Sequence, residues 1–394
     1  MSLPPLILKK NEDRRLRAGH LWVFSNEVDI KRTPLKAFAP GEAVEIQGSN
    51  GRAIGTGYVN PASLICARLL SRDVEHVPDR SLLAHRLNIA LSLRERLYAK
   101  PFYRLVFGES DNLPGLVVDR YGEVLVVQIT TSGMERMKAE IVAALAKVMK
   151  PSGILLRNDV GIRELEGLPL YTEVAQGVVP DVVSIEEHGC RFEVPLSGGQ
   201  KTGWFFDQHD NRGRMLRYIP GKRVLDVFSY VGAWGIQAMT HQARASICVD
   251  SSSTALAMAT RNAMLNQVQI DTRAADGFDA LRELHAADEK FDVVILDPPA
   301  FVKRKKDLMA GREAYQRLNQ FGMQVLERDG LLISCSCSYH MPTDSLLAGI
   351  QSASRHLDRQ AQVLEQGGQS ADHPVHPAIP ETSYLKAFFV RVVG

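Results

Sequence analysis

The stretch Lys222–Gly235, KRVLDVFSYVGAWG, begins as an apolar strand, reaches an acid at Asp226 and continues through small residues that open a helix. The same strand-then-helix alternation continues toward the C-terminus. Expected strands cover 222–228, 245–250, 291–297 and 331–336, and expected helices run to about 241 and over 252–267 and 313–328, the last stopped by Asp329-Gly330. Continuous apolar strands that alternate with helices are typical of a parallel sheet with both faces covered. The pattern predicts an α/β fold.

The turn after the first strand indicates what this sheet binds. Ligands of such sheets gather at the carboxyl ends of the strands. DVFSYVG is not GxGxxG, and an acid at this point would repel a pyrophosphate, whereas it suits a cationic group. S-adenosylmethionine (SAM) carries an amino group and a sulfonium and no phosphate. We therefore expect Asp226, with Phe228, Tyr230 and Gly232 in the turn, to contact SAM.

Two more acids follow strands in the same register. Asp250 ends the next strand, 24 residues after Asp226, where an acid can accept both ribose hydroxyls. Asp276, in ADGF, could reach the adenine amino group. A single acid at a strand end can be purely structural, but three in register favour a SAM site.

The fourth strand ends in LDPPAF, with Asp297, Pro298, Pro299 and Phe301. Two prolines fix a rigid turn whose carbonyls point outward, and the aromatic ring offers a face on which a base can stack. A tight turn without function is the plain alternative. An acid followed by Pro-Pro and an aromatic also resembles enzymes that methylate exocyclic amines of adenine or guanine.

The pair Cys335 and Cys337 in GLLISCSCSYH (330–340) separates these chemistries. The five cysteines have no regular spacing, and thiols two apart in a strand lack disulfide geometry. Zinc would need further ligands, of which His340, His373 and His376 are nearest, and no metal is expected. Cys335, inside the strand, suits packing. Cys337, just past its end, suits a nucleophile.

Cytosine methylation would use such a thiol. Adding a thiolate to C6 turns the ring into an enamine whose C5 attacks the methyl group. Asp297 could hydrogen-bond the base N3 and amine. Methylation of an exocyclic amine needs no thiol. Two alternatives remain open: amine methylation with packing cysteines, and an RNA-binding assembly factor with an inactive domain.

The front of the chain has a different pattern. Short apolar runs at 21–24, 43–46 and 64–70 predict a β-rich module. A helix capped by Asp79 is expected over 79–98, then a hairpin with Gly122 near its turn, then a helix over 137–149 that Pro151 terminates. The predicted domains are 1–75, 76–190 and 191–394.

Charge favours an anionic partner. Residues 1–100 hold 16 Lys and Arg against 10 acids, although the net charge is only +2. The candidate RNA contacts are Lys10, Arg14, Arg15 and Arg17 beside Trp22 and Phe24, together with Lys303, Arg304 and Lys305 beside DPPAF. Ordinary solvated charge is the alternative. No apolar run is long enough for a signal peptide or a membrane span, so a cytoplasmic protein is expected.

From Arg14 to Val393 the chain resembles the large-subunit ribosomal RNA methyltransferase I family, PUA-domain-containing 5-methylcytosine methyltransferases. The resemblance lies in RRLRAGHLWVFSNEV (14–28), GESDNLPGLVVDRYG (108–122), IEEHGCRFEV (185–194), GGQKTGWFFDQHDNR (198–212), DVFSYVG (226–232), DPPAF (297–301) and SCS (336–338). It implies an N-terminal PUA domain, a small central α+β domain and a C-terminal Rossmann-like class I methyltransferase domain acting on 23S rRNA.

The resemblance also implies residue roles. Cys337 is implied as the nucleophile, and Asp226, Asp250 and Asp276 as cofactor ligands. The loop implied to close over SAM holds Gln200, Lys201, Thr202, Phe205 and Asp207. Two details depart from the family: His209 stands where Arg is more frequent, and Cys335 is a second thiol.

Several points stay open at this level. From the residues alone, Gln200 and Lys201 could bind the methionine carboxylate or backbone, or the stretch could be a loop before a helix with Arg212 on its wet face. IEEHG suggests a hairpin turn with Glu186, Glu187 and His188 exposed, of unassigned role. The target nucleotide, naked RNA against a partly assembled subunit as substrate, and a homodimer are also left open.

Overall fold

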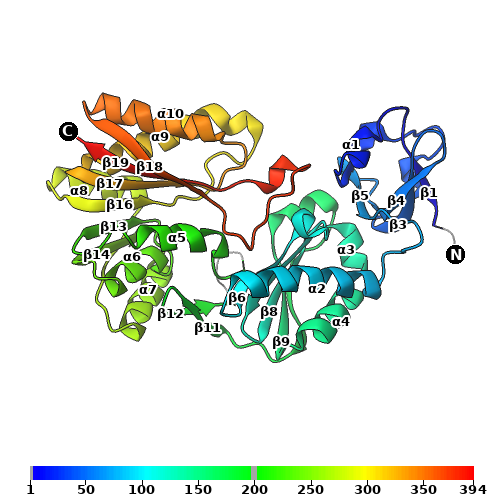
Figure 1. The fold of residues 1–394 in the computed structure, drawn as a ribbon, viewed down its shortest axis with the longest axis horizontal. Helices are drawn as coiled ribbons and strands as arrows, with labels where there is room; N and C mark the ends of the chain where they lie inside the picture. Colours follow the sequence, from blue (N-terminus) through cyan, green and yellow to red (C-terminus); the bar gives the residue numbers. More distant parts are fainter. Residues whose placement is uncertain (1–2, 197–201) are drawn as a thin grey trace. The chain divides into compact units, whose positions relative to one another are not determined.

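The computed structural model describes residues 3–196 and 202–394, which fall into two compact units (Figure 1). The first comprises Met1–Val183, Pro195–Phe206 and Asp372–Thr382, and the second comprises Ser184–Val194, Asp207–Ala371 and Ser383–Gly394. Within the described ranges, no helix is long and apolar enough to cross a membrane. The three-domain division drawn from the sequence remains a prediction.

The second unit is built on a seven-stranded sheet, which confirms the predicted α/β class. In spatial order its strands are β15 (Asp271–Ala274), β14 (Ala245–Asp250), β13 (Arg223–Val227), β16 (Phe291–Leu296), β17 (Leu326–Ser336), β19 (Lys386–Val393) and β18 (Gln360–Gly368). The first five are parallel, and β19 is antiparallel to both of its neighbours. The strand order reverses between β13 and β16, the point at which such sheets bind ligands.

Helices cover both faces of this sheet (Figure 1). One face carries α5 (His209–Met215), α6 (Ala233–Thr240) and α7 (Ser253–Leu265), and the other carries α8 (Gly277–Ala286), α9 (Leu308–Gln324) and α10 (Thr343–His356). The two buried cores lie on opposite sides: Leu281, Tyr315 and Ile350 belong to one, and Met215 and Trp234 to the other. A hairpin of β11 (Val182–Glu187) and β12 (Cys190–Pro195) precedes the sheet.

The predicted helix over 313–328 was wrong in its bounds. α9 ends at Gln324, and Asp329-Gly330, expected to stop the helix, lies inside β17. The cause is pairing with the last strand: Asp329 lies opposite Val393, and its carboxylate accepts from the Arg391 guanidinium at 2.6 Å. Local turn propensity is overridden by this long-range ladder. By contrast, α7 begins as predicted, with Ser252 Oγ accepting from the Ala255 amide.

The first unit contains two five-stranded sheets. One has the order β1 (Pro5–Ile7), β3 (Glu42–Gln47), β4 (Ala53–Val59), β5 (Ile65–Ser71), β2 (Trp22–Phe24), beside the short helix α1 (Arg14–Arg17). The other has the order β10 (Tyr171–Gly177), β9 (Gly153–Asn158), β8 (Val124–Ile129), β7 (Leu116–Tyr121), β6 (Phe102–Phe107), with helices α2 (Arg80–Leu97), α3 (Ser132–Arg136) and α4 (Lys138–Met149). The expected β-rich N-terminal module is confirmed.

Local signals predicted several boundaries of this unit correctly. Asp79 Oδ1 accepts from the Leu82 amide at 2.8 Å and caps α2. Gly122, at φ +66°, lies in the β7–β8 turn, and α4 ends at Met149, followed by Lys150 in the left-handed region. The two sheets pack together through buried contacts: the Tyr58 hydroxyl donates to the Pro114 carbonyl at 2.8 Å.

Candidate functional site

Asp226 is a fully buried acid in β13. Its Oδ2 accepts from the Gly235 amide at 3.0 Å, while its Oδ1 is buried and has no hydrogen-bond partner among the described residues. Burial, together with the neighbouring acids Asp297 and Asp250, raises the pKa of this carboxyl to about 7. A buried acceptor without a donor is costly, so the site fits a cationic ligand group.

The turn after β13 exposes backbone in an unusual conformation. Phe228, Tyr230 and Gly232 all have positive φ, at 68°, 50° and 83°. Two non-glycine residues in this region indicate stored strain of a kind that concentrates at ligand sites. Asp250, the last residue of β14, holds the turn because its Oδ2 accepts from the Tyr230 amide at 2.9 Å. A Cβ on Gly277 would lie 2.5 Å from the Phe228 ring, so only glycine allows this approach.

Asp276 has a structural partner that the sequence did not reveal. Its Oδ1 caps α8, accepting from the amides of Phe278 at 2.9 Å and Asp279 at 3.3 Å. The residue is exposed beyond β15, which pairs with β14. A helix cap alone explains the acid at this position.

Asp297 follows β16 and is held by two side chains. Its Oδ1 accepts from Gln208 Nε2 at 2.8 Å and its Oδ2 from Trp234 Nε1 at 3.1 Å. Burial raises its pKa to about 6. Trp234 and Gly235 are adjacent in the first turn of α6, so this one turn fixes both Asp297 and Asp226. Gln208 and Trp234 were missed in the sequence, where a single Gln and Trp carry no such signal.

The two cysteines have different surroundings. Cys335 is fully buried in the core, and burial raises the pKa of its thiol well above the usual range. Cys337 follows β17 and is partly buried, with Sγ 3.9 Å from the Pro298 carbonyl oxygen. The structure therefore brings Cys337 to the DPPAF turn, and it leaves Cys335 in the sheet.

A buried cation binds the segment that carries this thiol. Lys386, the first residue of β19, is 8% exposed, and its Nζ donates to the carbonyls of Ser338 at 2.7 Å and Tyr384 at 3.0 Å. Burial lowers its pKa to about 8, while Cys337 acts in the opposite direction. None of the described carboxylates forms an ion pair with it. The signal that could have found Lys386 is a lone cation opening the apolar run KAFFVRVV.

The other residues of the DPPAF turn and of the basic run after it differ in exposure. Phe301 is partly buried, with its ring 4.8 Å from that of Tyr315, and Pro298 is buried. Lys303, Arg304 and Lys305 are exposed, and Arg304 pairs with Asp307 at 3.3 Å.

The predicted cofactor loop is only partly described. Gln200 and Lys201 lie outside the described residues. Thr202 and Phe205 belong to the first unit, where the Thr202 carbonyl accepts from the Tyr121 hydroxyl at 3.0 Å. Asp207 belongs to the second unit, and its carboxylate accepts from the Tyr384 hydroxyl at 2.5 Å.

The EEHG segment forms the expected hairpin turn, but the expectation that Glu187 is exposed was wrong. His188 and Gly189, at φ 49° and 79°, form the turn of the β11–β12 hairpin, as predicted. Glu187, however, is buried and accepts from Arg212 Nη2 at 2.9 Å and Gln237 Nε2 at 2.8 Å. Arg212 is buried as well and not on a wet face. The hairpin is thus fastened to α5 and α6 by an internal ion pair.

In the N-terminal module, the four predicted cations are exposed. Arg15 pairs with Glu27 at 2.7 Å and lies 4.7 Å over the Phe24 ring, and Arg17 pairs with Asp13 at 2.7 Å. Among the residues that the structure describes, no cluster of three or more His, Cys, Asp or Glu could hold a metal ion.

Comparison with known proteins places the chain. A PUA-like domain family matches residues 6–72, and the family described as Conserved hypothetical protein 95 matches residues 205–336. The Ribosomal RNA large subunit methyltransferase I proteins of Erwinia tasmaniensis and Cronobacter sakazakii are each 38% identical to it, over 98% of this chain and 99% of theirs. A crystal structure described as a methyltransferase complexed with SAH superposes with a TM-score of 0.84, at 22% identity, over 99% of this chain and 100% of that one. The similarity to this crystal structure shows the fold. The identity over nearly the full length shows that the chain belongs to the ribosomal RNA large subunit methyltransferase I family.

Proposed function

We propose that the protein transfers a methyl group from SAM to C5 of a cytosine in 23S ribosomal RNA, with Cys337 as the nucleophile. The observation that carries this proposal is the approach of Cys337 Sγ to the Pro298 carbonyl, beside an Asp297 carboxyl whose pKa is raised to about 6. An amine methyltransferase would need the acid but not the thiol. The names of the relatives support ribosomal RNA as the substrate.

The residues around β13 fit SAM, which supplies the electrophilic methyl group. Asp226 offers an unpartnered oxygen to a cation, and Asp250 lies at the end of the adjacent strand to receive the ribose. We assign Phe228, Tyr230 and Gly232 to the turn that lies against the cofactor, and Asp276 to the adenine. Gln200, Lys201, Thr202, Phe205 and Asp207 are proposed as the loop that closes over it.

The chemistry follows from the positions of two side chains. The Cys337 thiolate adds to cytosine C6, forming the S–C6 bond, and C5 then takes the methyl group. Asp297 holds the base through N3 and the amine, and its raised pKa favours sharing a proton with N3 as charge builds on the ring. Loss of the C5 proton to solvent expels the thiolate and restores both aromatic ring and enzyme.

Lys386 supplies the charge that this thiol needs. A thiolate is the reactive form of cysteine, and an adjacent cation favours it. Lys386 meets this requirement because its ammonium is buried and bound only by carbonyl oxygens in the described structure. We include it as a positioning residue that stabilises the Cys337 thiolate and fixes the segment after β17.

RNA contacts and location complete the proposal. The RNA contacts are proposed at Lys10, Arg14, Arg15, Arg17, Pro298, Phe301, Lys303, Arg304 and Lys305. We also propose three domains, at 1–75, 76–190 and 191–394, and action in the cytoplasm on rRNA.

The decisive experiment compares the two cysteines. Cys337→Ala is expected to abolish both methylation of rRNA and covalent trapping on RNA that contains 5-fluorocytosine, because no S–C6 bond can form. Cys335→Ala removes a buried thiol of the same type and is expected to retain both. Trapping is read by gel shift, and the product by mass spectrometry of nucleosides. Undiminished trapping in the Cys337 variant, or an N-methylated purine as the product, would contradict the proposal.

A further inference from the structure

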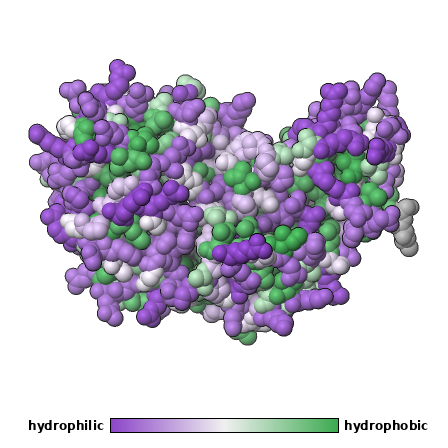
Figure 2. Space-filling view, viewed as in Figure 1, coloured by the Kyte–Doolittle hydropathy of each residue, from purple (hydrophilic) through white to green (hydrophobic). Residues whose placement is uncertain are grey.

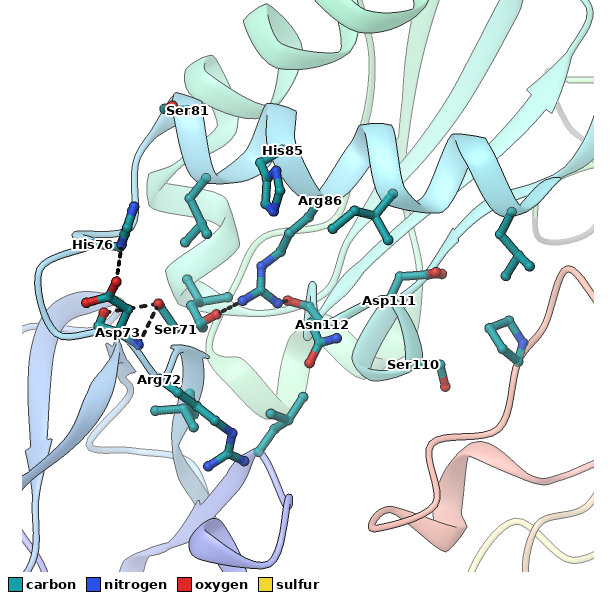
Figure 3. Close-up of a pocket in the computed structure, with 17 residues that line it drawn as sticks. Ser71, Arg72, Asp73, His76, Ser81, His85, Arg86, Ser110, Asp111 and Asn112 are labelled. Atoms are coloured by element: carbon teal, nitrogen blue, oxygen red, sulfur yellow. Dashed lines mark hydrogen bonds and ion pairs between the residues drawn. The ribbon is translucent and has the colours of Figure 1, made fainter. Parts of the chain in front are cut away.

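A cavity of about 780 Å³ opens in the first unit, between the end of β5 and one side of α2 (Figure 3). Most of its wall comes from three segments: the exit from β5 with Arg72, α2 with Arg86 and Ile89, and the 3-10 turn that contains Ser110. Leu21 and Pro374 complete the lining. Its volume is within the range of small-ligand pockets in proteins. None of the residues expected from the sequence to bind RNA lines it.

Two arginines give this cavity uncompensated positive charge. Arg72 Nη1 donates to the Leu16 carbonyl at 2.7 Å, and Arg86 donates to the carbonyls of Leu70 and Asn112 (Figure 3). Carbonyls orient a guanidinium but leave its charge unbalanced, and each Arg keeps further N–H donors. Burial lowers the pKa of Arg86, and no carboxylate opposes that effect. Across the described chain, neither arginine forms an ion pair.

Of the two acids that line the cavity, Asp111 is ion-paired and Asp73 is hydrogen-bonded to a histidine. Asp111 is held by Arg94, with Oδ1 at 2.6 Å from Nη1 and Oδ2 at 2.8 Å from Nη2. Asp73 Oδ2 lies 2.9 Å from His76 Nδ1. With Asp111 paired to Arg94, two arginines face one further carboxylate, so the charge of the cavity favours anions.

Part of the wall formed by α2 is apolar, and one buried polar atom of the lining has no hydrogen-bond partner among the described residues. Ile89 and Leu93 on α2 are 59% and 37% exposed, and both line the cavity. Exposed apolar side chains are visible as green patches over α2 (Figure 2). Ser110 Oγ is buried and has no hydrogen-bond partner in the described structure. A ligand that suits this lining has an anionic group, a flat apolar face and hydrogen-bonding edges, which is the chemistry of a nucleotide.

We propose that this cavity binds one nucleotide of single-stranded RNA, with the phosphates on its two sides at Arg72 and Arg86 and its base against Ile89 and Leu93. The inference rests on the proposed function insofar as the substrate is RNA. It adds a binding point on the first unit that is independent of Cys337. Single-stranded RNA suits the cavity better than a duplex because only an unstacked base can enter.

The test uses the full chain and a fluorescein-labelled RNA of about 12 uridines, which contains no cytosine for the methylation site. Ile89→Glu places a negative charge in the wall and is expected to weaken binding about tenfold. Leu97→Glu is the matched control, since Leu97 is 49% exposed at the end of the same helix and does not line the cavity. Arg72→Gln is expected to reduce the slope of log affinity against log salt by about one.

Folding is checked by the unfolding midpoint and by S-adenosylhomocysteine binding of each variant. Parental affinity of both Ile89→Glu and Arg72→Gln for oligouridine would overturn the proposal. It would also be overturned if Ile89→Glu affected binding of a blunt RNA duplex or of polyglutamate more than that of oligouridine. The Cys337→Ala variant separates the two proposals: it is expected to bind oligouridine normally while it fails to methylate, whereas the cavity variants lose affinity whatever the methylated atom is.

Discussion

At the scale of single residues, the two acids at the carboxyl edge of the sheet, Asp226 and Asp297, differ in their hydrogen-bond partners. Asp297 has a donor on each oxygen, whereas Asp226 has one oxygen without a donor among the described residues and a pKa raised to about 7. Binding of a cationic amino group favours the ionised carboxylate, so binding releases a proton below this pKa. The affinity for SAM is therefore expected to rise about fivefold from pH 6 to pH 7, about tenfold from pH 6 to pH 8, and to level off above pH 8.

Isothermal calorimetry in buffers of different ionisation enthalpy measures both the affinity and the proton release. Asp226→Asn serves as the control, because an amide cannot titrate: its affinity is expected to be weaker and flat with pH. A pH dependence that survives in this variant would mean that another group carries the effect.

Lys386 gives a second prediction at this scale. Its ammonium lies beside the segment of Cys337 and is bound by two carbonyls. Lys386→Met is expected to slow alkylation of Cys337 by iodoacetamide about tenfold at neutral pH and to move the reaction profile to higher pH, because the thiolate loses its cation. Lys386→Arg keeps the charge and is expected to restore the profile. The other four cysteines are buried, so the labelled peptide identifies the reacting thiol. If Lys386→Met does not change the pH dependence of Cys337 alkylation, Lys386 contributes only to packing.

At the scale of elements, the β11–β12 hairpin is fastened to α5 by Glu187 and Arg212, both buried. Arg212 and Gln237 hold the pKa of Glu187 at about 2 despite its burial. Because this pKa is depressed, the stabilisation is complete above the ordinary carboxyl value and is lost as pH falls toward 2. Glu187→Gln is expected to lower the free energy of unfolding by about 3 kcal/mol at neutral pH, since it removes the carboxylate that pairs with the buried Arg212.

Urea unfolding at pH 7 and pH 3 measures this difference, which is expected to shrink at the lower pH. The double variant Glu187→Gln/Arg212→Met removes both charges and is expected to be less destabilised than Glu187→Gln. Equal loss in the single and double variants would show that the ion pair is not the cause.

Elements also show where sequence reasoning works and where it fails. The apolar runs at 245–250 and 291–297 identified their strands because a strand buried on both faces has a local signature. The same logic placed Asp226, Asp297 and Cys337 at one edge of the sheet. It could not find Lys386, whose position depends on the antiparallel register of β19 against β17, or Gln208, which reaches Asp297 across 89 positions of sequence. Long-range register leaves no trace in local pattern.

At the scale of the whole molecule, the strand-end residues proposed to bind the cofactor and the proposed nucleotide cavity belong to different compact units, although Thr202 and Phe205 of the proposed cofactor loop belong to the first unit. Asp226, Asp250 and Cys337 belong to the second unit, and the cavity at Arg72 and Arg86 belongs to the first. A ligand stabilises the unit that binds it, and amide hydrogen exchange reports such stabilisation locally. S-adenosylhomocysteine is expected to slow exchange in β13, β14 and α6, with β3 to β5 unchanged, and oligouridine to slow exchange at the start of α2. Asp250→Ala, which removes the side-chain acceptor of the Tyr230 amide, is expected to remove the first response and keep the second. Slowed exchange in β3 to β5 on addition of S-adenosylhomocysteine alone would contradict this separation, because those strands contribute no residue to the proposed cofactor site.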